Sequence, residues 1–266
     1  MQLFKALLAA TLMAMPLALP AQARDVAIGA IEDTDMAKVQ HAEWTRLLGK
    51  YVLAFDDGVN RVDYGALKAN PADMAALDAY IAGFADRDLS GSNDAAFAAW
   101  ANLYNAVTVR YIVEKYPLVS IKDGYFFGGP WKKIMVNASG RRISLDDIEH
   151  KILRPTFNDP RVHYAVNCAS FSCPNLLTKA WEPATLDKDL DAAARAYVNT
   201  PRGATVSDRG LVVSSIYDWY TADFGGSKQS VIDHLLKYAD TGLAKQIRAN
   251  PKIRSYAYDW SLNDTE

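Results

Sequence analysis

The sequence is poor in cysteine and has no excess of charge of either sign. Its 266 residues include two cysteines, which excludes a fold built on several disulfides but is compatible with one bridge. The 29 lysine and arginine residues are balanced by 31 aspartate and glutamate residues, so the chain lacks the basic excess typical of nucleic-acid binding. We therefore expect no nucleic-acid partner.

Short motifs of the common enzyme classes are also missing. The sequence contains no GxGxxG or P-loop pattern for phosphate groups, no HExxH zinc motif and no GxSxG serine motif. No cofactor and no metal ion are predicted from motifs of this kind. Hydrophobic residues, by contrast, make up 50% of the chain, which is enough for a sizeable core.

The one long apolar run lies at the N-terminus. Lys5 precedes the run Ala6–Leu19, and Ala21–Ala23 has the small residues of a signal-peptidase site. A membrane-spanning helix needs about 20 apolar residues, so this run is too short to span a bilayer. We expect residues 1–23 to be a signal peptide, removed after Ala23. The mature protein is then periplasmic or secreted and has no membrane span.

Three amphipathic helices are expected in the first half of the chain. Apolar residues recur at three- and four-residue spacing over His41–Val52, Met74–Phe84 and Ser92–Tyr116. Ser92 is the expected N-cap of the third helix, and Pro117 ends it. Because this helix is apolar over most of its surface, we expect it to be buried on more than one side.

After residue 117 the pattern changes to short strands, turns and short helices. Ser144 and Asp147 have the spacing of a capping box. The expected elements are hairpins at 131–145 and 203–214, a strand at 161–167, and helices at 145–153, after Thr185, at 216–224 and at 228–238. Helices followed by mixed elements indicate one α+β domain of about 240 residues. In it the helical N-terminal region 24–91 is continuous with 92–266 and packs on a small mixed or antiparallel sheet with hairpins.

Two basic pairs fall on the expected hairpin at 131–145. Lys132–Lys133 and Arg141–Arg142 lie on its opposite arms. We interpret them as a solvated face of the hairpin, with a small site for an anionic ligand as the alternative.

The segment Asp159–Pro174 has the highest density of chemically active residues. It contains both cysteines, Cys168 and Cys173, together with His163. In an oxidising compartment the first interpretation is a disulfide, which stabilises by about 2 kcal/mol on the loop-closure model. The alternatives are a Cys168 thiolate nucleophile, a zinc site that uses both cysteines and His163, and two inert buried thiols.

A nucleophilic Cys168 needs a base that raises its thiolate fraction near neutral pH. His163 is one candidate, and His150, on the outer side of the expected helix 145–153, is the other. On a regular strand His163 and Asn167 share one face and Cys168 lies on the other. His163 therefore reaches Cys168 only if the chain turns at Asn167, which is itself a candidate orienting group.

Two amides, Asn102 and Asn105, lie on the long apolar helix and require polar partners. An unpaired buried amide costs about 1–3 kcal/mol. The two amides either hydrogen-bond a neighbouring loop or line a cleft beside the cysteine loop. We expect this cleft to be the default site for a ligand. Its candidate residues are Trp100, Asn102, Tyr104, Asn105 and Arg161.

Several segments together resemble a known family. They are Trp100–Ala106, Asp159–Cys168, Ser172–Pro174, Leu186–Arg195, Ile216–Phe224 and Tyr258–Asn263. In this order they are similar to the family called domain of unknown function 547, over about residues 97–263. The resemblance implies an exported bacterial member of a family that also occurs, joined to other regions, in plants. That family has no settled activity, so the resemblance supports the domain more than any function.

Three functions remain open from the sequence. The first is a disulfide-stabilised module, either ligand-binding or accessory to the cell envelope, whose partner is a small molecule or peptide. The alternative is a thiol-dependent hydrolase or acyl transferase of cysteine-peptidase type with Cys168 as nucleophile. Dithiol redox exchange ranks third because the CxxC spacing is missing. The oxidation state of the two cysteines distinguishes these functions. The sequence contains no pattern that predicts the oligomeric state.

Overall fold

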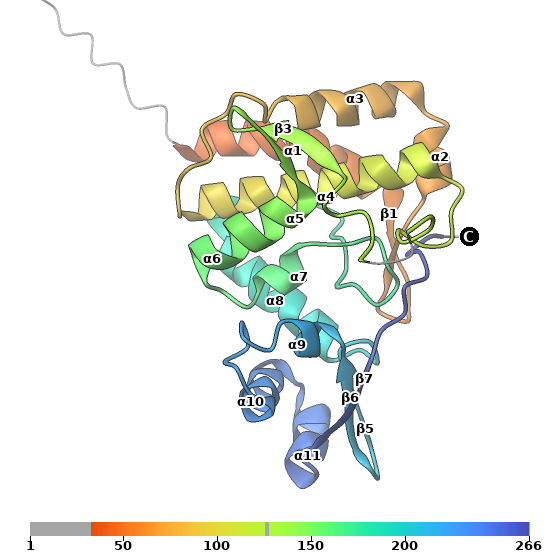
Figure 1. The fold of residues 1–266 in the computed structure, drawn as a ribbon, viewed down its shortest axis with the longest axis vertical. Helices are drawn as coiled ribbons and strands as arrows, with labels where there is room; N and C mark the ends of the chain where they lie inside the picture. Colours follow the sequence, from red (N-terminus) through yellow and green to blue (C-terminus); the bar gives the residue numbers. More distant parts are fainter. Residues whose placement is uncertain (1–32, 126–127, 266) are drawn as a thin grey trace, which may run out of the picture. The chain divides into compact units, whose positions relative to one another are not determined.

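The structure is a computed structural model that describes residues 33–125 and 128–265 (Figure 1). All of these residues belong to one compact unit. Within the described residues, no helix is both long and apolar enough to cross a membrane. The expected signal peptide, residues 1–23, lies outside the described part of the chain.

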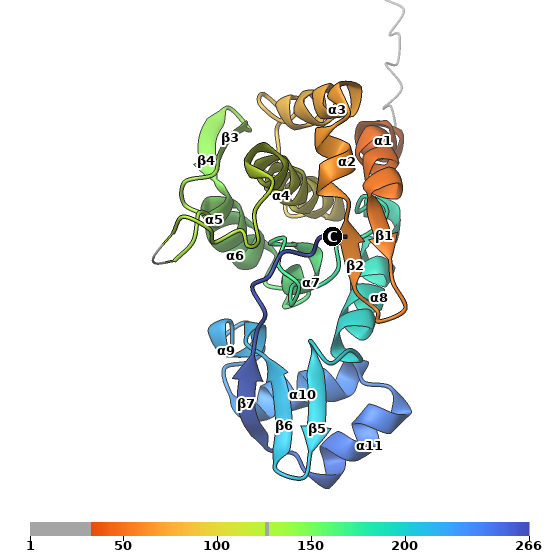
Figure 2. The same ribbon diagram turned by 90° about the vertical axis from the view of Figure 1, so that its right-hand side faces the viewer.

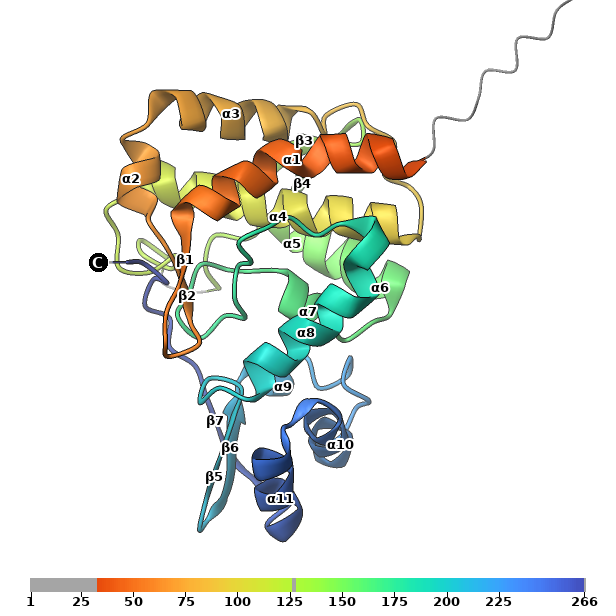
Figure 3. The ribbon, with the colours of Figure 1, turned by 180° about the vertical axis from the view of Figure 1, so that it is seen from behind.

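The first half of the unit is helical. Its helices are α1 (Asp33–Tyr51), α2 (Tyr64–Lys68), α3 (Pro71–Ala82) and α4 (Asp94–Lys115), and the hairpin β1 (Val52–Ala54) and β2 (Asn60–Val62) follows α1. The three helices expected here are confirmed, although α4 is capped by Asn93 and not by Ser92. Helix α4 packs against the other three (Figures 1 and 3), and almost every residue from Ala96 to Val109 is buried. It is therefore the central element of the larger core.

The next segment of the chain, from the second hairpin to Phe157, lies on the side of α4 opposite α1 (Figure 2). The expected hairpin is β3 (Met135–Ala138) and β4 (Arg141–Ser144), and it leads into α5 (Leu145–Asp147). The Ser144–Asp147 capping box is present as expected. The chain continues through a π-helical turn, η1 (Ile148–Leu153), α6 (Arg154–Phe157), α7 (Val162–Ala165), the 3-10 turn η2 (Pro183–Thr185) and α8 (Leu186–Val198).

The strand expected at 161–167 is wrong, because Val162–Ala165 is one turn of helix, α7. The carboxylate of Asp159 accepts the backbone N–H of Arg161 at 2.8 Å, and its carbonyl accepts the N–H of Val162 at 3.1 Å. These two hydrogen bonds start the helical turn. A short apolar run does not by itself distinguish a buried strand from a buried helix.

The last part of the unit has its own small core. The strands β5 (Ala204–Ser207), β6 (Gly210–Ser214) and β7 (Ile253–Ala257) form a sheet in that order, antiparallel between β5 and β6 and parallel between β6 and β7. The helices here are α9 (Ile216–Trp219), α10 (Lys228–Tyr238) and α11 (Thr241–Ala249), and α10 and α11 cover one face of the sheet (Figure 2). Small sheets and many helices confirm the α+β class.

The C-terminal segment returns from β7 to the first half of the unit (Figure 2). Phe171 donates its backbone N–H to the carbonyl of Ser261 at 2.6 Å, and Asn263 donates to that of Ala169 at 2.9 Å. The Tyr64 hydroxyl donates to the side-chain oxygen of Asn263 at 2.7 Å. These bonds fix residues 258–263 against the cysteine loop, 90 residues earlier in the sequence.

Candidate functional site

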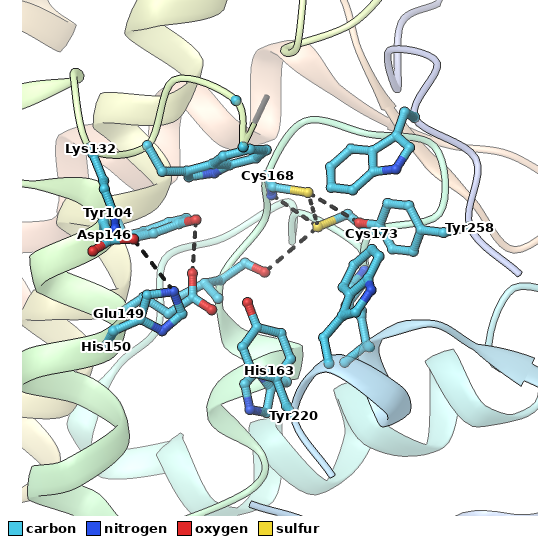
Figure 4. Close-up of a pocket in the computed structure, with 18 of the residues that line it drawn as sticks. Tyr104, Lys132, Asp146, Glu149, His150, His163, Cys168, Cys173, Tyr220 and Tyr258 are labelled. Carbon is cyan, nitrogen blue, oxygen red and sulfur yellow. Dashed lines mark hydrogen bonds and ion pairs between the residues drawn. The ribbon is translucent and has the colours of Figure 1, made fainter. Parts of the chain in front are cut away.

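A cavity of about 500 Å³ opens beside the cysteine loop (Figure 4). Both cysteines line it, together with polar groups from η1 and from the segment before β3. Its aromatic lining residues are Tyr104, Trp131, Trp219, Tyr220, Tyr258 and Trp260. The four rings of Trp131, Trp219, Tyr258 and Trp260 contact one another with centroid distances of 4.5–5.8 Å. Its volume is typical of a small-molecule site.

The π-helical turn supplies two of the polar groups. A single π turn inside a helix changes the direction of the side chains and is frequent at functional sites. Glu149 is buried and accepts a hydrogen bond from the Tyr104 hydroxyl at 3.2 Å. His150 is half-buried; its Nδ1 accepts from Arg154 at 3.0 Å, and its Nε2 lies 3.8 Å from an oxygen of Asp146.

The two cysteines face each other as free thiols, and the expected disulfide is not formed. Their sulfur atoms lie 2.9 Å apart, and the backbone N–H of Cys168 donates to the sulfur of Cys173 at 2.9 Å. The Cys168 sulfur also contacts the hydroxyls of Ser170 at 3.0 Å and Tyr258 at 3.2 Å. Cys168 is partly exposed to the cavity, whereas Cys173 is buried.

The environment separates the acidities of the two thiols. Burial acts to raise the pKa of Cys168, but hydrogen bonds from Cys173, Ser170 and Tyr258 outweigh burial and lower this pKa to about 7. Burial and the neighbouring Cys168 raise the pKa of Cys173 well above its usual value. The pair therefore has one accessible thiol that ionises near neutral pH and one buried thiol that stays protonated.

The loop between the cysteines is held in a tight turn. Ala169 has a φ of 62°, in the left-handed region that residues other than glycine rarely adopt. The side chain of Asn167 accepts the N–H of Ala169 at 2.9 Å and donates to the carbonyl of Pro174 at 2.7 Å. Asn105 accepts the N–H of Asn167 at 2.8 Å and donates to the carbonyl of Ala165 at 2.9 Å. The chain thus turns at Asn167, and both asparagines position the loop.

The other residues expected in the cleft lie elsewhere, with Tyr104 as the exception. Asn102 is buried and pairs with both backbone groups of Trp181 at 2.9 Å. The indole N–H of Trp100 donates to the carbonyl of Leu89 at 3.1 Å. The guanidinium of Arg161 forms ion pairs outside the cavity with Asp159, Asp187 and Asp191. The amide at position 102 therefore hydrogen-bonds a neighbouring loop, the first of the two roles considered for it.

His163 lines the same cavity but makes its contacts away from the sulfur atoms. Its Nε2 hydrogen-bonds Asp223 at 2.7 Å, and its ring stacks on Tyr220 with a centroid distance of 4.0 Å. Burial acts to raise the pKa of Asp223, but His163 and Arg154 outweigh it and hold this pKa far below the usual range. The hydrogen bonds of the Cys168 sulfur go to Cys173, Ser170 and Tyr258. His163 is thus paired with a carboxylate and not with the thiol.

Within residues 33–125 and 128–265 there is no group of three or more His, Cys, Asp or Glu side chains that fits a metal ion. The zinc interpretation of the two cysteines with His163 therefore has no geometric support, since His163 pairs with Asp223.

Comparison with protein families agrees with the motifs in the sequence. Residues 88–198 match the family model described as Protein of unknown function, DUF547. The match supports the family expected from the motifs, and it covers α4, η1, α7 and both cysteines. No curated protein and no solved structure matches the chain.

The cavity draws on residues inside and outside the DUF547 match. Tyr104, Glu149 and the cysteines lie inside it, whereas Trp219 and Tyr258 come from the later segments. The roles of Glu149, Tyr258 and the aromatic cluster are not predictable from local motifs. The segments 216–224 and 258–263, which carry part of the family resemblance, contain Trp219, Tyr220, Tyr258 and Trp260. Lys132 and Lys133 are exposed, as expected for a solvated face of the hairpin, and both also line the cavity.

Proposed function

We propose that the protein is an exported module that exchanges thiols and disulfides in this cavity. Cys168 is the attacking thiolate and Cys173 is the resolving thiol. The observation that supports this function best is the contact of 2.9 Å between an accessible sulfur and a buried one. The lowered pKa of Cys168 and the raised pKa of Cys173 match these two roles.

The exchange proceeds in two balanced steps. The Cys168 thiolate attacks one sulfur of a substrate disulfide, which forms a mixed disulfide and releases the other half as a thiolate that takes a proton from solvent. Cys173 then attacks the Cys168 sulfur and forms the internal disulfide, while its proton passes to the sulfur of the second half, which leaves as a thiol. The protein loses two electrons and the substrate gains them. A second thiol compound reverses these steps and restores the dithiol.

This proposal includes the module expected from the sequence. In the oxidised half of the cycle the cysteines form a disulfide that stabilises the ligand-binding loop, as in a disulfide-stabilised envelope module. Exchange, ranked third from the sequence because the CxxC spacing is missing, is favoured by the structure's distance of 2.9 Å between the two sulfur atoms. Residues 169–172 fold back and bring the two thiols together despite the longer spacing.

Thiol-dependent acyl transfer is a second candidate, because Glu149 and His150 line the cavity that Cys168 faces. A thiolate attacks an acyl carbon as well as a disulfide, and either side chain supplies an acid for the leaving group. Exchange is favoured because acyl transfer leaves the adjacent Cys173 without a role. The hydrogen bonds of both histidines also go to partners other than the sulfur.

The two functions differ in the substrate that the protein turns over. We expect the reduced protein to accelerate the reduction of bis(2-hydroxyethyl) disulfide by a thiol such as glutathione, measured by chromatography as the release of 2-mercaptoethanol against the uncatalysed rate. We expect no acceleration of the hydrolysis of an aryl thioester under the same conditions. Acceleration of the thioester alone would establish acyl transfer and reject exchange.

A further inference from the structure

The cavity walls differ in chemistry, and this difference bears on the substrate (Figure 4). Lys132, Asp146, Glu149 and His150 lie together on one side. The sulfur pair lies on the other side, next to Tyr258. A ligand that fills the cavity therefore places one end against charged groups and the other against the thiols.

The charged wall has groups of both signs that remain available to a ligand. Among the described residues the Lys132 ammonium has no hydrogen bond or ion pair. In the part of the chain that the structure describes, the Asp146 carboxylate has no hydrogen bond from a side chain; the His150 ring nitrogen lies 3.8 Å from it, and the Lys151 ammonium acts on it without forming an ion pair. Of the remaining charged side chains that line the cavity, Glu149 accepts a hydrogen bond from Tyr104 at 3.2 Å, and Lys133 lies 4.9 Å from the centre of the Tyr125 ring.

Backbone hydrogen bonds hold the segments that carry the two available groups. Asp146 donates its N–H to the carbonyl of Trp131 at 3.2 Å, which ties the start of α5 to the residue before Lys132. Ile134 donates to the carbonyl of Pro130 at 3.0 Å and closes the turn that contains Lys132. An ammonium and a carboxylate are thus presented from adjacent segments of backbone.

We propose that the substrate is a small disulfide with an amino-acid head group, an inference that rests on the proposed exchange. The carboxylate of the head group pairs with Lys132, and its ammonium pairs with Asp146. Complementary charges of this kind set specificity and orientation more than raw affinity. The cavity volume of about 500 Å³ suits one half of such a disulfide, with two to three amino-acid residues, while the leaving half extends from the partly exposed Cys168 toward solvent. With the head group held on the charged wall, the disulfide end reaches the Cys168 sulfur.

Ligands with a single charge fit this wall less well. A purely cationic ligand meets Lys132 and Lys133, and one face of the Trp260 ring already has the Lys122 ammonium 4.5 Å from its centre. A purely anionic ligand meets Asp146 and Glu149. A ligand with both charges pairs with both available groups and leaves neither sign unmatched.

A panel of small disulfides tests this specificity. The probes are oxidised glutathione with both charges, cystamine as a dication, dithiodiglycolate as a dianion and neutral bis(2-hydroxyethyl) disulfide. We expect kcat/KM, normalised to the uncatalysed reaction of each disulfide, to be about tenfold higher for oxidised glutathione than for the others. Lys132→Gln and Asp146→Asn should each remove most of this preference, whereas Lys245→Gln, on the exposed side of α11, should keep it.

The failure of this inference can be told from the failure of the proposed function. Equal normalised values across the panel, or a preference that Lys132→Gln leaves intact, would overturn the head-group inference while exchange stands. If no disulfide reacts, exchange fails, and binding is then measured by tryptophan fluorescence with S-methylglutathione, which has both charges and cannot exchange. Binding that weakens about tenfold in Lys132→Gln supports the head-group site, and absence of binding rejects it.

Discussion

Replacement of Cys168 by serine is expected to abolish exchange, with a loss on the order of 1,000-fold in the rate of small-disulfide reduction. Serine has nearly the same size, but its hydroxyl does not ionise near neutral pH, so no attacking anion forms. Because a serine hydroxyl can keep the hydrogen bonds that the Cys168 sulfur makes with Ser170 and Tyr258, we expect the circular dichroism spectrum of the variant to match the wild type. The measurement is the release of 2-mercaptoethanol from bis(2-hydroxyethyl) disulfide, followed by chromatography.

Cys173→Ser is the matched variant and should fail at a different step. Its Cys168 still attacks, but no resolving thiol follows, so the protein accumulates a mixed disulfide with half of the substrate. Intact mass spectrometry should find this adduct on nearly every molecule, and tandem spectra should locate it at residue 168. If Cys173→Ser turns over at the wild-type rate, or if Cys168→Ser retains activity, the assigned roles are wrong.

The rate of Cys168 alkylation should titrate with a midpoint near pH 7, since its pKa is lowered to about 7. The thiolate is the reactive form, so the rate with iodoacetamide rises with pH through this midpoint and falls below it. Removal of a hydroxyl that stabilises the thiolate should raise the midpoint. We expect Tyr258→Phe and Ser170→Ala each to shift it by about one unit toward the ordinary value near 8.5.

Tyr256→Phe is the control for this titration, because Tyr256 lies on β7 two residues earlier and does not line the cavity. Its midpoint should equal that of the wild type. A wild-type midpoint at or above pH 8.5, or identical midpoints in Tyr258→Phe and Tyr256→Phe, would contradict the role of the Tyr258 hydroxyl. Peptide mapping after limited alkylation assigns the reacted thiol to Cys168 or Cys173.

The helices of the first half were predictable from the sequence because their signals are local. Apolar spacing and caps are properties of neighbouring residues, so α3 and α4 were expected nearly at their bounds. Helix α7 was not predicted because a short, mostly apolar segment fits either a strand or a helix, and the Asp159 hydrogen bonds that start the turn have no clear signal in the sequence. Strand β7 was not predicted, because it is stabilised by parallel pairing with β6, about 40 residues away.

The candidate site was predictable in part. The nearness of Cys168 and Cys173 follows from a short loop, and the pairing of Asn105 with that loop follows from the cost of a buried amide. The expectation that a histidine lies at the sulfur came from analogy with other thiol enzymes, and the geometry gives that place to the Tyr258 hydroxyl. Tyr258 follows Cys168 by 90 residues and reaches it only because the C-terminal segment returns to the cysteine loop.

The most direct test of the central claim is the oxidation state that the wild-type protein reaches with a substrate disulfide. The reduced protein is incubated with excess bis(2-hydroxyethyl) disulfide, quenched with acid and alkylated, and its mass and peptide map are recorded over time. We predict a transient adduct at Cys168. It is followed by a protein whose mass is two hydrogen atoms below that of the reduced form and by a peptide in which Cys168 and Cys173 are joined. A stable adduct on wild-type Cys168 with Cys173 still alkylatable, or two free thiols after prolonged incubation, would contradict thiol–disulfide exchange.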